Sequence, residues 1–294
     1  MSLLIGTRGS ALALAQAEKV IALLERRGIG AEKVVISTLG DTVTGVPLHE
    51  IGGQGVFVRA LDDALLRGEI DAAVHSAKDI PAKRPGGLVT CAVLERDSPA
   101  DFLVHTVPFH EVRVIGTSST RRRAQLLEHY PDIGVAPLRG NVDTRLRKLK
   151  EGQFDAIVLA EAGLQRLGLS LPGTRLPPET FVPSPNQGTI AVVSREGGTA
   201  GEIAEALDHP PTRRDIGLER IVMEEVGGGC FTPLGIYCDR GHLHAEVLSL
   251  AGDRSVRKDR ICADEQSALA FAREIGAEAA PLVREAYEKL GLKE

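Results

Sequence analysis

The pattern of apolar and polar positions predicts strands and helices that alternate along the first part of the chain. Short apolar runs at 3–7, 33–39 and 70–75 are typical of buried strands. Longer amphipathic stretches at 11–27 and 56–67 predict helices between them. Alternation of this kind favours an α/β domain with a substantially parallel sheet.

The same order of elements starts again from about residue 101. Ile115-Gly116-Thr117 repeats Ile5-Gly6-Thr7, and both lie where a predicted strand ends ahead of a polar turn. The segment 152–158 likewise repeats 68–74. Because the two matches occur in the same order, we expect two similar lobes rather than a solenoid of tandem repeats.

The second lobe is predicted to be an insertion in the first. A proline-rich crossover at 177–185 precedes an apolar strand at 190–193 that can return to the first sheet. A helix at 217–226, strand patterns near 236 and at 245–250, and a long helix at 266–290 then indicate a separate α+β domain. The predicted boundaries are 1–94 with 189–206 for domain 1, 99–184 for domain 2 and 209–294 for domain 3.

The amino-acid composition argues against several classes of function. The 294 residues are 43% hydrophobic and 26% charged, which is typical of a globular protein with proper cores. Aromatic residues make up 3%, without tryptophan, so platforms for stacking nucleic-acid bases are not expected. We find no secretion signal and no apolar stretch long enough to span a membrane, and expect a cytoplasmic protein. The four scattered cysteines form neither a disulfide framework nor a zinc motif, and no other metal motif is present.

The charge is unevenly distributed. Net charge is −5, yet arginine is concentrated at 121–123 and in the segment 139–147. A mildly acidic chain that gathers its guanidinium groups is better suited to a small anion than to a nucleic-acid backbone.

Four polar turns follow predicted strands, where open α/β sheets bind ligands. They combine hydroxyl side chains near helix N-termini with guanidinium groups, and so offer donors to carboxylates or phosphates. Two lobes that present such turns to each other would form a cleft for a ligand with several anionic groups. The turns are Thr7–Ser10, with Ser10 as the predicted N-cap, His75–Asp79, Thr117–Arg123 and Arg139–Arg145.

Two further residues are candidates for chemistry. Asp79 lies beside Lys78 and can either accept and return a proton or serve as a plain salt-bridge partner. Cys230 lies in a glycine-framed loop, where it is either a buried, inert thiol or a nucleophile. No base neighbours it in sequence, and the preceding helix C-terminus would raise its pKa, so a turnover nucleophile is poorly supported.

The chain closely resembles the porphobilinogen deaminase (hydroxymethylbilane synthase) family over about residues 1–235. The motifs that carry the resemblance are GTRGSALA at 6–13, GGQGVFV at 52–58, VHSAKDIP at 74–81, GTSS at 116–119, LRGNVDTR at 138–145, AGLQRLG at 162–168, NQG at 186–188 and GGC at 228–230.

The resemblance implies three domains, of which the first two are similar to type II periplasmic binding proteins. It implies stepwise deamination and head-to-tail coupling of four porphobilinogen molecules, and release of linear hydroxymethylbilane. Growth would begin on a dipyrromethane cofactor bound by thioether to Cys230. Asp79 matches the family aspartate that assists deamination and stabilises the cationic, azafulvene-like intermediate.

The resemblance also assigns residues to the acetate and propionate groups of the pyrroles. The positions that bind these groups or steer the growing chain are matched by Arg8, Arg121, Arg122, Arg139, Arg145 and Arg166. Supporting positions are matched by Ser10, Ser76, Lys78, Thr117, Ser119 and Gln187. Gln54 departs from the family pattern, because many relatives have lysine there, and so one carboxylate contact is in doubt. We expect a monomer that passes its product to a downstream cyclising enzyme and binds neither nucleic acid nor membrane.

Two rival hypotheses follow from the same residues. A two-lobed receptor for a small anion would explain the lobes and the arginines but leaves Cys230 inert. Nucleic-acid binding through 121–123 is weakened by the acidic net charge and the scarcity of aromatic residues.

Overall fold

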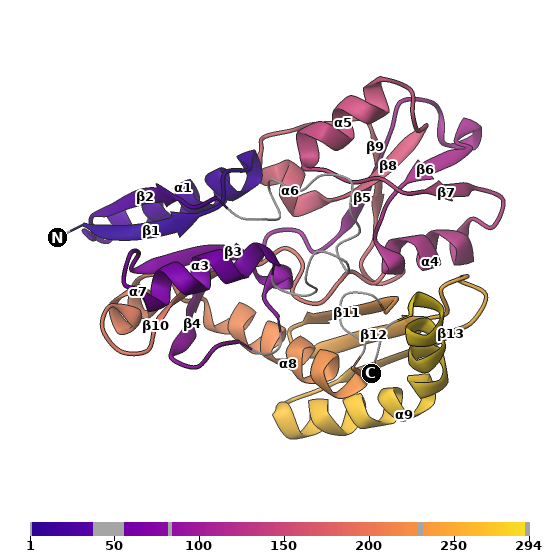
Figure 1. The fold of residues 1–294 in the computed structure, drawn as a ribbon. Helices are drawn as coiled ribbons and strands as arrows, with labels where there is room; N and C mark the ends of the chain where they lie inside the picture. The colour runs from indigo at the N-terminus through magenta and orange to yellow at the C-terminus, as the bar shows by residue number, and fades with distance from the viewer. Residues whose placement is uncertain (1, 38–55, 82–83, 228–231, 292–294) are drawn as a thin grey trace. The chain divides into compact units, whose positions relative to one another are not determined.

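The computed structural model describes residues 2–37, 56–81, 84–227 and 232–291. The chain forms two compact units (Figure 1). The first comprises the residues up to Asp97 together with Arg166–Gly168 and Gly188–Arg213, and the second comprises Ser98–Gln165, Leu169–Gln187 and Arg214–Glu294.

The first unit is built on a five-stranded sheet. Its strand order is β2 (Ala31–Val35), β1 (Leu3–Thr7), β3 (Ala72–Ser76), β10 (Ile190–Arg195) and β4 (Leu88–Val93). Four of these strands run in the same direction, and β10 runs antiparallel to its neighbours β3 and β4. The segment that leads into β10 joins the sheet beside the C-terminal end of β3, where the backbone amide of Ala77 donates to the carbonyl of Thr189. Because β10 begins at that end, it runs in the opposite direction to β3. The predicted α/β sheet and the return of 190–193 to it are confirmed. The helices of this unit are α1 (Ala11–Glu25), α3 (Val56–Leu66) and α7 (Ala200–Leu207), with a 3-10 turn at Ala77–Asp79.

The second unit contains a sheet with the same topology. Its order is β7 (Gly134–Ala136), β6 (Val114–Gly116), β8 (Ala156–Ala160), β5 (Asp101–His105) and β9 (Gly173–Leu176). Here β5 is the strand that runs antiparallel to both neighbours, in the same place as β10 in the first sheet. The helices beside this sheet are α4 (Thr120–His129), α5 (Val142–Lys150) and α6 (Glu161–Arg166), with a 3-10 turn at Phe109–Glu111.

The predicted repeat therefore reflects repeated structure, down to individual hydrogen bonds. The carboxylate of Asp71 accepts a hydrogen bond from the backbone amide of Leu4 at 2.8 Å, just before β3. The carboxylate of Asp155 accepts one from the backbone amide of Val114 at 2.8 Å, just before β8. Each aspartate satisfies a backbone donor at the start of a central strand and so sets the register of two parallel strands.

The glycines of the two repeats also share a role. A Cβ atom on Gly6 would lie 2.3 Å from the side chain of Ile70, and one on Gly116 would lie 2.9 Å from that of Phe154. In both sheets the residue before the aspartate packs its apolar side chain over the glycine. The repeated glycine is therefore required by packing.

The C-terminal part of the second unit is a three-stranded antiparallel sheet. Its strands, in order, are β11 (Leu234–Asp239), β12 (His242–Leu248) and β13 (Ser255–Ile261). The long α9 (Glu265–Leu290) and the part of α8 (Pro210–Val226) from Arg214 onward belong to the same unit. The core between sheet and helices includes Phe271, Ile236 and Val247, which are fully buried. The α+β character is as predicted, but the pattern did not predict β13.

Two departures from the sequence pattern have local causes. Most residues of β13 are charged or polar and exposed, because it is an edge strand, and so it lacks the apolar alternation of a half-buried strand. Helix α8 begins at Pro210 rather than at residue 217, since proline is tolerated in the first turn of a helix.

The C-terminal sheet packs directly on α4. The turn between β12 and β13 contains Gly252, whose φ of +73° is favourable only for glycine and whose Cβ would lie 2.3 Å from the carbonyl oxygen of Ala124. The hydroxyl of Ser255 donates to the carboxylate of Glu128 at 2.8 Å. The sheet and α4 therefore meet at backbone contact distance.

Replacing Gly252 with alanine should lower the thermal midpoint of the second unit markedly. The new Cβ would meet the backbone of α4 and the residue would keep a strained φ, and we expect a cost of about 2–4 kcal/mol. Calorimetric unfolding of the full chain measures this. Gly28→Ala is the matched control, because its φ of +79° is similar but nothing lies within 4 Å of the added Cβ. Equal losses in both variants would show that the contact with α4 is not tight.

Candidate active site

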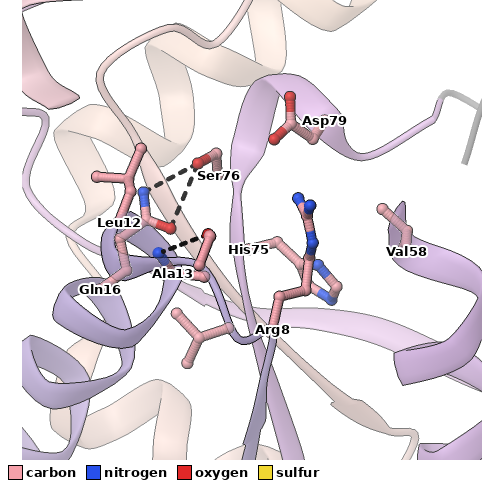
Figure 2. A pocket seen from close by; sticks show the side chains of 10 residues that line it. Arg8, Leu12, Ala13, Gln16, Val58, His75, Ser76 and Asp79 are labelled. Carbon is pink, nitrogen blue, oxygen red and sulfur yellow. Dashed lines mark hydrogen bonds between the residues drawn. The ribbon is translucent and has the colours of Figure 1, made fainter. Parts of the chain in front are cut away.

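A pocket in the first unit brings together four of the residues predicted from the sequence. Arg8 follows β1, Ser10 caps α1, and Ser76 and Asp79 follow from the end of β3 (Figure 2). The carboxyl ends of parallel strands lie at one edge of a sheet, which explains why turns distant in sequence converge. Among the described residues, the pocket is lined by Arg8, Ser10, Leu12, Ala13, Gln16, Val58, Val74, His75, Ser76 and Asp79.

Local hydrogen bonds set the walls of this pocket. The hydroxyl of Ser10 accepts a hydrogen bond from the backbone amide of Ala13 at 3.3 Å, as predicted for an N-cap. The amide of Gln16 donates to the hydroxyl of Ser76 at 2.9 Å and so connects α1 to the end of β3. The sequence analysis missed Gln16. Its position in line with the apolar Val20 and Leu24 of α1 was the available clue, because a buried amide on an apolar stripe requires a partner.

Asp79 is the carboxylate of the pocket. It ends the 3-10 turn that follows β3, and its side chain is exposed to the pocket, while Arg8 extends toward it in Figure 2. Lys78 is half-buried beside it and is not part of the described lining. An accessible carboxylate beside a guanidinium can accept a proton and can stabilise a cation that forms nearby.

His75 is a second residue that the sequence analysis did not single out. It is 5% exposed, and its Nε2 is buried without a hydrogen-bond partner among the described residues. Burial, and then the charges of Arg84 and Arg8, lower the pKa of His75 to about 3. The imidazole is therefore neutral over the physiological range and leaves Asp79 as the accessible acid–base group of the pocket.

The second unit contains a buried cluster around Asp101, which is fully buried at the start of β5. Its two carboxylate oxygens accept hydrogen bonds from Nη2 of Arg121 at 2.8 Å and from Nη2 of Arg122 at 2.6 Å. Burial acts to raise the pKa of the Asp101 carboxyl, but the charges of Arg122 and Arg121 outweigh it and hold that pKa below its usual range. The carboxylate is thus ionised and shared by two cations.

The cluster has more positive charge and more donors than its own groups satisfy. Arg121 and Arg122 are only 4% and 6% exposed, and the Nε of each is buried without a partner in the described structure. In the described structure Asp101 is the carboxylate in direct contact with both guanidinium groups, whereas Glu246 acts on Arg121 from further away and pairs with Arg257. The direct contact leaves one positive charge of the pair without a carboxylate of its own. Buried charges are normally paired, and so this surplus indicates an anion.

Three more predicted residues lie around the arginine pair. Ser119 is the N-cap of α4 and accepts from the backbone amide of Arg122, and the hydroxyl of Thr117 accepts from the amide of Ser119. The amide of Gln187 donates to Asp101 at 2.8 Å. These side chains fix the start of α4 and the carboxylate that the arginines share.

Arg139 precedes α5, and Arg145 lies within that helix. Arg139 is exposed, and Nε of Arg145 donates to the carbonyl of Gly140 at 2.8 Å. Burial, and then the charge of Arg122, lower the pKa of Arg145 to about 10. Arg145 thus adds a third guanidinium group to the field around the Asp101 cluster.

Arg166 belongs to the first unit, and it is part of neither the described pocket lining around Asp79 nor the cluster around Asp101. Its Nε donates to the carboxylate of Asp97 at 2.8 Å and its Nη2 donates to the carbonyl of Gly188 at 2.6 Å. The side chain is 7% exposed, so these bonds tie together the three chain segments of the unit.

Two residues of the sequence analysis, Cys230 and Gln54, lie outside the described residues. The remaining cysteines, Cys91, Cys238 and Cys262, are buried. In the described part of the chain, no group of three or more histidine, cysteine or acidic side chains is arranged to hold a metal ion. Likewise, no helix in the described ranges is long and apolar enough to cross a membrane.

His75 should make the free energy of unfolding depend on pH in a specific way. The unfolded chain binds a proton at this residue near pH 6.5, whereas the folded chain does so only at about 3. The unfolded state therefore gains protons first as the pH falls, and the stability contributed by neutral His75 is complete above 6.5 and is lost below it. The slope is up to about 1.4 kcal/mol per pH unit.

Denaturant unfolding between pH 7 and 4 measures this slope. His75→Gln, which cannot titrate, should show a shallower fall in the free energy of unfolding than the wild type. In NMR spectra the His75 ring signals should stay unchanged from pH 8 to 5. A titration midpoint near 6.5 would contradict the assignment.

Comparison with known proteins identifies the group to which these features belong. A family model described as porphobilinogen deaminase, dipyromethane cofactor binding domain, matches residues 3–202. A probable porphobilinogen deaminase from Methanosarcina mazei is 50% identical over 286 residues, covering 93% of this chain and 90% of the relative. A porphobilinogen deaminase from Nitratidesulfovibrio vulgaris (strain DSM 19637 / Miyazaki F) is 43% identical over 275 residues, covering 87% and 85%.

Among solved structures, the chain is similar to an ABC transporter periplasmic substrate-binding protein from Coxiella burnetii. The TM-score is 0.43 at 15% identity, and the match covers 71% of this chain and 93% of that one. The family model and the relatives, taken with the repeated sheets and the arginine cluster, establish that this chain belongs to the porphobilinogen deaminase family.

Proposed function

We propose that this chain is a hydroxymethylbilane synthase of tetrapyrrole biosynthesis. It deaminates four porphobilinogen molecules in turn, couples them head to tail on a covalently bound dipyrromethane primer, and releases linear hydroxymethylbilane by hydrolysis. The observation that carries the proposal is the surplus of buried guanidinium groups around Asp101, which suits a ligand with several carboxylates.

The arginine cluster has the donors that such a ligand requires. Every pyrrole ring of the primer and of the growing chain has an acetate and a propionate, and these carboxylates repel one another. The positive charges of Arg121, Arg122 and Arg145, which the carboxylate of Asp101 only partly offsets, can compensate this repulsion. The residues thus fit dipyrromethane, which supplies the pyrrole carbon to which the first substrate couples.

Asp79 performs the proton chemistry. In each cycle the bond between the aminomethyl carbon of porphobilinogen and nitrogen breaks, and ammonia leaves. The carbon so released bonds to the free α-carbon of the terminal ring, which then loses its proton. The exposed carboxylate of Asp79 stabilises the cationic pyrrole and accepts this proton, while neutral His75 adds no competing positive charge.

The other predicted residues support binding, and Cys230 is assigned as the attachment point of the cofactor. Arg8, Ser10 and Ser76 would hold substrate beside Asp79, and Thr117, Ser119 and Gln187 would hold the arginine pair in place. Lys78, Arg139 and Arg166 are assigned to ligand binding by the family motifs alone. We also propose the division into 1–94 with 189–206, 99–184 and 209–294, which the three separate sheets support.

The proposal also covers the cellular location and the oligomeric state of the enzyme. We assign it as a cytoplasmic monomer that hands hydroxymethylbilane to a cyclising enzyme.

Purified protein from cells that supply porphobilinogen should contain a two-pyrrole adduct on Cys230. Intact-mass measurement and peptide mapping locate it, and the Ehrlich reaction gives the colour of a dipyrromethane. Incubation with porphobilinogen should then release ammonia and hydroxymethylbilane. Cys230→Ser is the control and should lack the adduct. Unmodified wild-type protein that binds porphobilinogen without consuming it would instead favour a receptor for a small anion.

Asp79→Asn should lower kcat by about 10²–10⁴, because the amide can neither accept the pyrrole proton nor balance the positive charge. The rate of porphobilinogen consumption by adduct-containing protein measures this. Glu69→Gln is the matched control, since it removes one negative charge from an exposed side chain of the same unit that pairs with Arg67. Equal rates for the two variants would exclude Asp79 as the catalytic group.

A further inference from the structure

A buried chain of side-chain hydrogen bonds connects the C-terminal sheet to Arg121. Glu246, on β12, is 2% exposed, and its Oε2 accepts a hydrogen bond from Nε2 of Gln125 at 2.6 Å. Oε1 of Gln125 accepts from Nη1 of Arg121 at 2.8 Å. Arg121 in turn donates from Nη2 to Asp101. The chain thus runs from the C-terminal sheet to the carboxylate that the arginine pair shares.

This chain has a defined direction. Oε2 of Glu246 accepts from the NH₂ group of Gln125, and a guanidinium can only donate hydrogen bonds. Glu246 therefore turns the NH₂ group of the Gln125 amide toward β12 and leaves its oxygen to face Arg121. If the amide rotated by half a turn, its NH₂ group would meet the donors of Arg121. The carbonyl of Val182, which accepts from both Gln125 and Arg121 at 3.0 Å, reinforces the same orientation.

Stability alone does not account for a carboxylate in this position. Burial raises the pKa of Glu246, which means that its ionised form loses hydration. Its direct cationic contact is Nη1 of Arg257, a half-buried side chain, at 3.4 Å. Replacing a weakly paired buried carboxylate with an apolar group is often neutral or stabilising. The advantage of Glu246 must then lie in the orientation that it imposes.

We propose that Glu246 is a positioning residue for Arg121, and that through Gln125 the C-terminal sheet sets the orientation in which this guanidinium receives a carboxylate. The proposal rests on the proposed function, in which Arg121 binds the acetate or propionate of a pyrrole. It adds that the sheet has a part in substrate binding, although Glu246 touches no ligand. The close packing of Gly252 and Ser255 on α4 gives the sheet a firm position from which to do so.

The decisive variant is Glu246→Leu, which removes the acceptor and keeps a side chain of similar size. We expect KM for porphobilinogen to rise about tenfold, which corresponds to one misplaced charge-assisted contact, with kcat within twofold of the wild type. The thermal midpoint should not fall. Glu246→Gln should restore KM to within about threefold, because its carbonyl oxygen can still accept from Gln125.

Two controls separate positioning from general stability. Val247→Ala removes a fully buried apolar group from the next position of β12 and should lower the thermal midpoint without changing KM. Gln125→Leu should raise KM as Glu246→Leu does, and the double variant should be no worse than Gln125→Leu alone, since both interrupt one chain. Additive effects in the double variant, or a Glu246→Gln variant as impaired as Glu246→Leu, would overturn the proposal.

Crystal structures of wild type and Glu246→Leu give a readout that does not depend on turnover. The guanidinium of Arg121 should leave its wild-type orientation toward Asp101 in the variant. An unmoved guanidinium would overturn the positioning role even if KM changed. A wild-type protein that does not consume porphobilinogen would count against the proposed function. In that case the positioning role of Glu246 would be tested only by the comparison of the two crystal structures. An active wild type with an unchanged KM in Glu246→Leu would reject it.

Discussion

The carboxylate of Asp101 is the group on which the chemistry of the second unit depends. It accepts hydrogen bonds from Arg121 and Arg122 on α4 and from Gln187, just before β10. Without it, two buried guanidinium groups would lack a counter-charge, a loss that usually costs several kcal/mol. One carboxylate for two cations is enough to keep the pair buried and too little to neutralise it. The same constraint that orders α4 thus prepares a place for an anion.

The two five-stranded sheets have equivalent strand arrangements but carry different functional groups. In each, a central strand ends beside a helix that begins at a serine N-cap, Ser10 for α1 and Ser119 for α4. In the first unit the neighbouring carboxylate, Asp79, is exposed to a pocket whose imidazole stays neutral. In the second unit the carboxylate, Asp101, is fully buried beneath two arginines. The first arrangement suits proton transfer, and the second suits the binding of carboxylates.

The C-terminal sheet contributes to this division beyond its own core. Gly252 brings it to backbone contact with α4, and Glu246 reaches the arginine pair through Gln125. Three layers of structure, from β12 through α4 to β5, are connected by hydrogen bonds of defined direction. The guanidinium of Arg121 is therefore held by residues from three elements, of which its own helix is one.

The amino-acid sequence alone determined the alternation of strands and helices, the N-cap at Ser10, the repeated lobes and the turns at which Asp79 and the arginines lie. These features depend on periodicity and on residues close in the chain, which a pattern displays directly. It did not predict β13, whose exposed edge lacks apolar alternation, nor Gln16 as part of the pocket, and it gave His75 no role beyond its place in a polar turn. Only the tertiary structure decided that Arg121 and Arg122 share Asp101, that Arg166 pairs with Asp97, and that Glu246 meets Gln125. These pairs join residues 20 to 121 positions apart. The packing of the sheets determines which charged residues come into contact across such separations in the chain. The local sequence pattern does not contain this information.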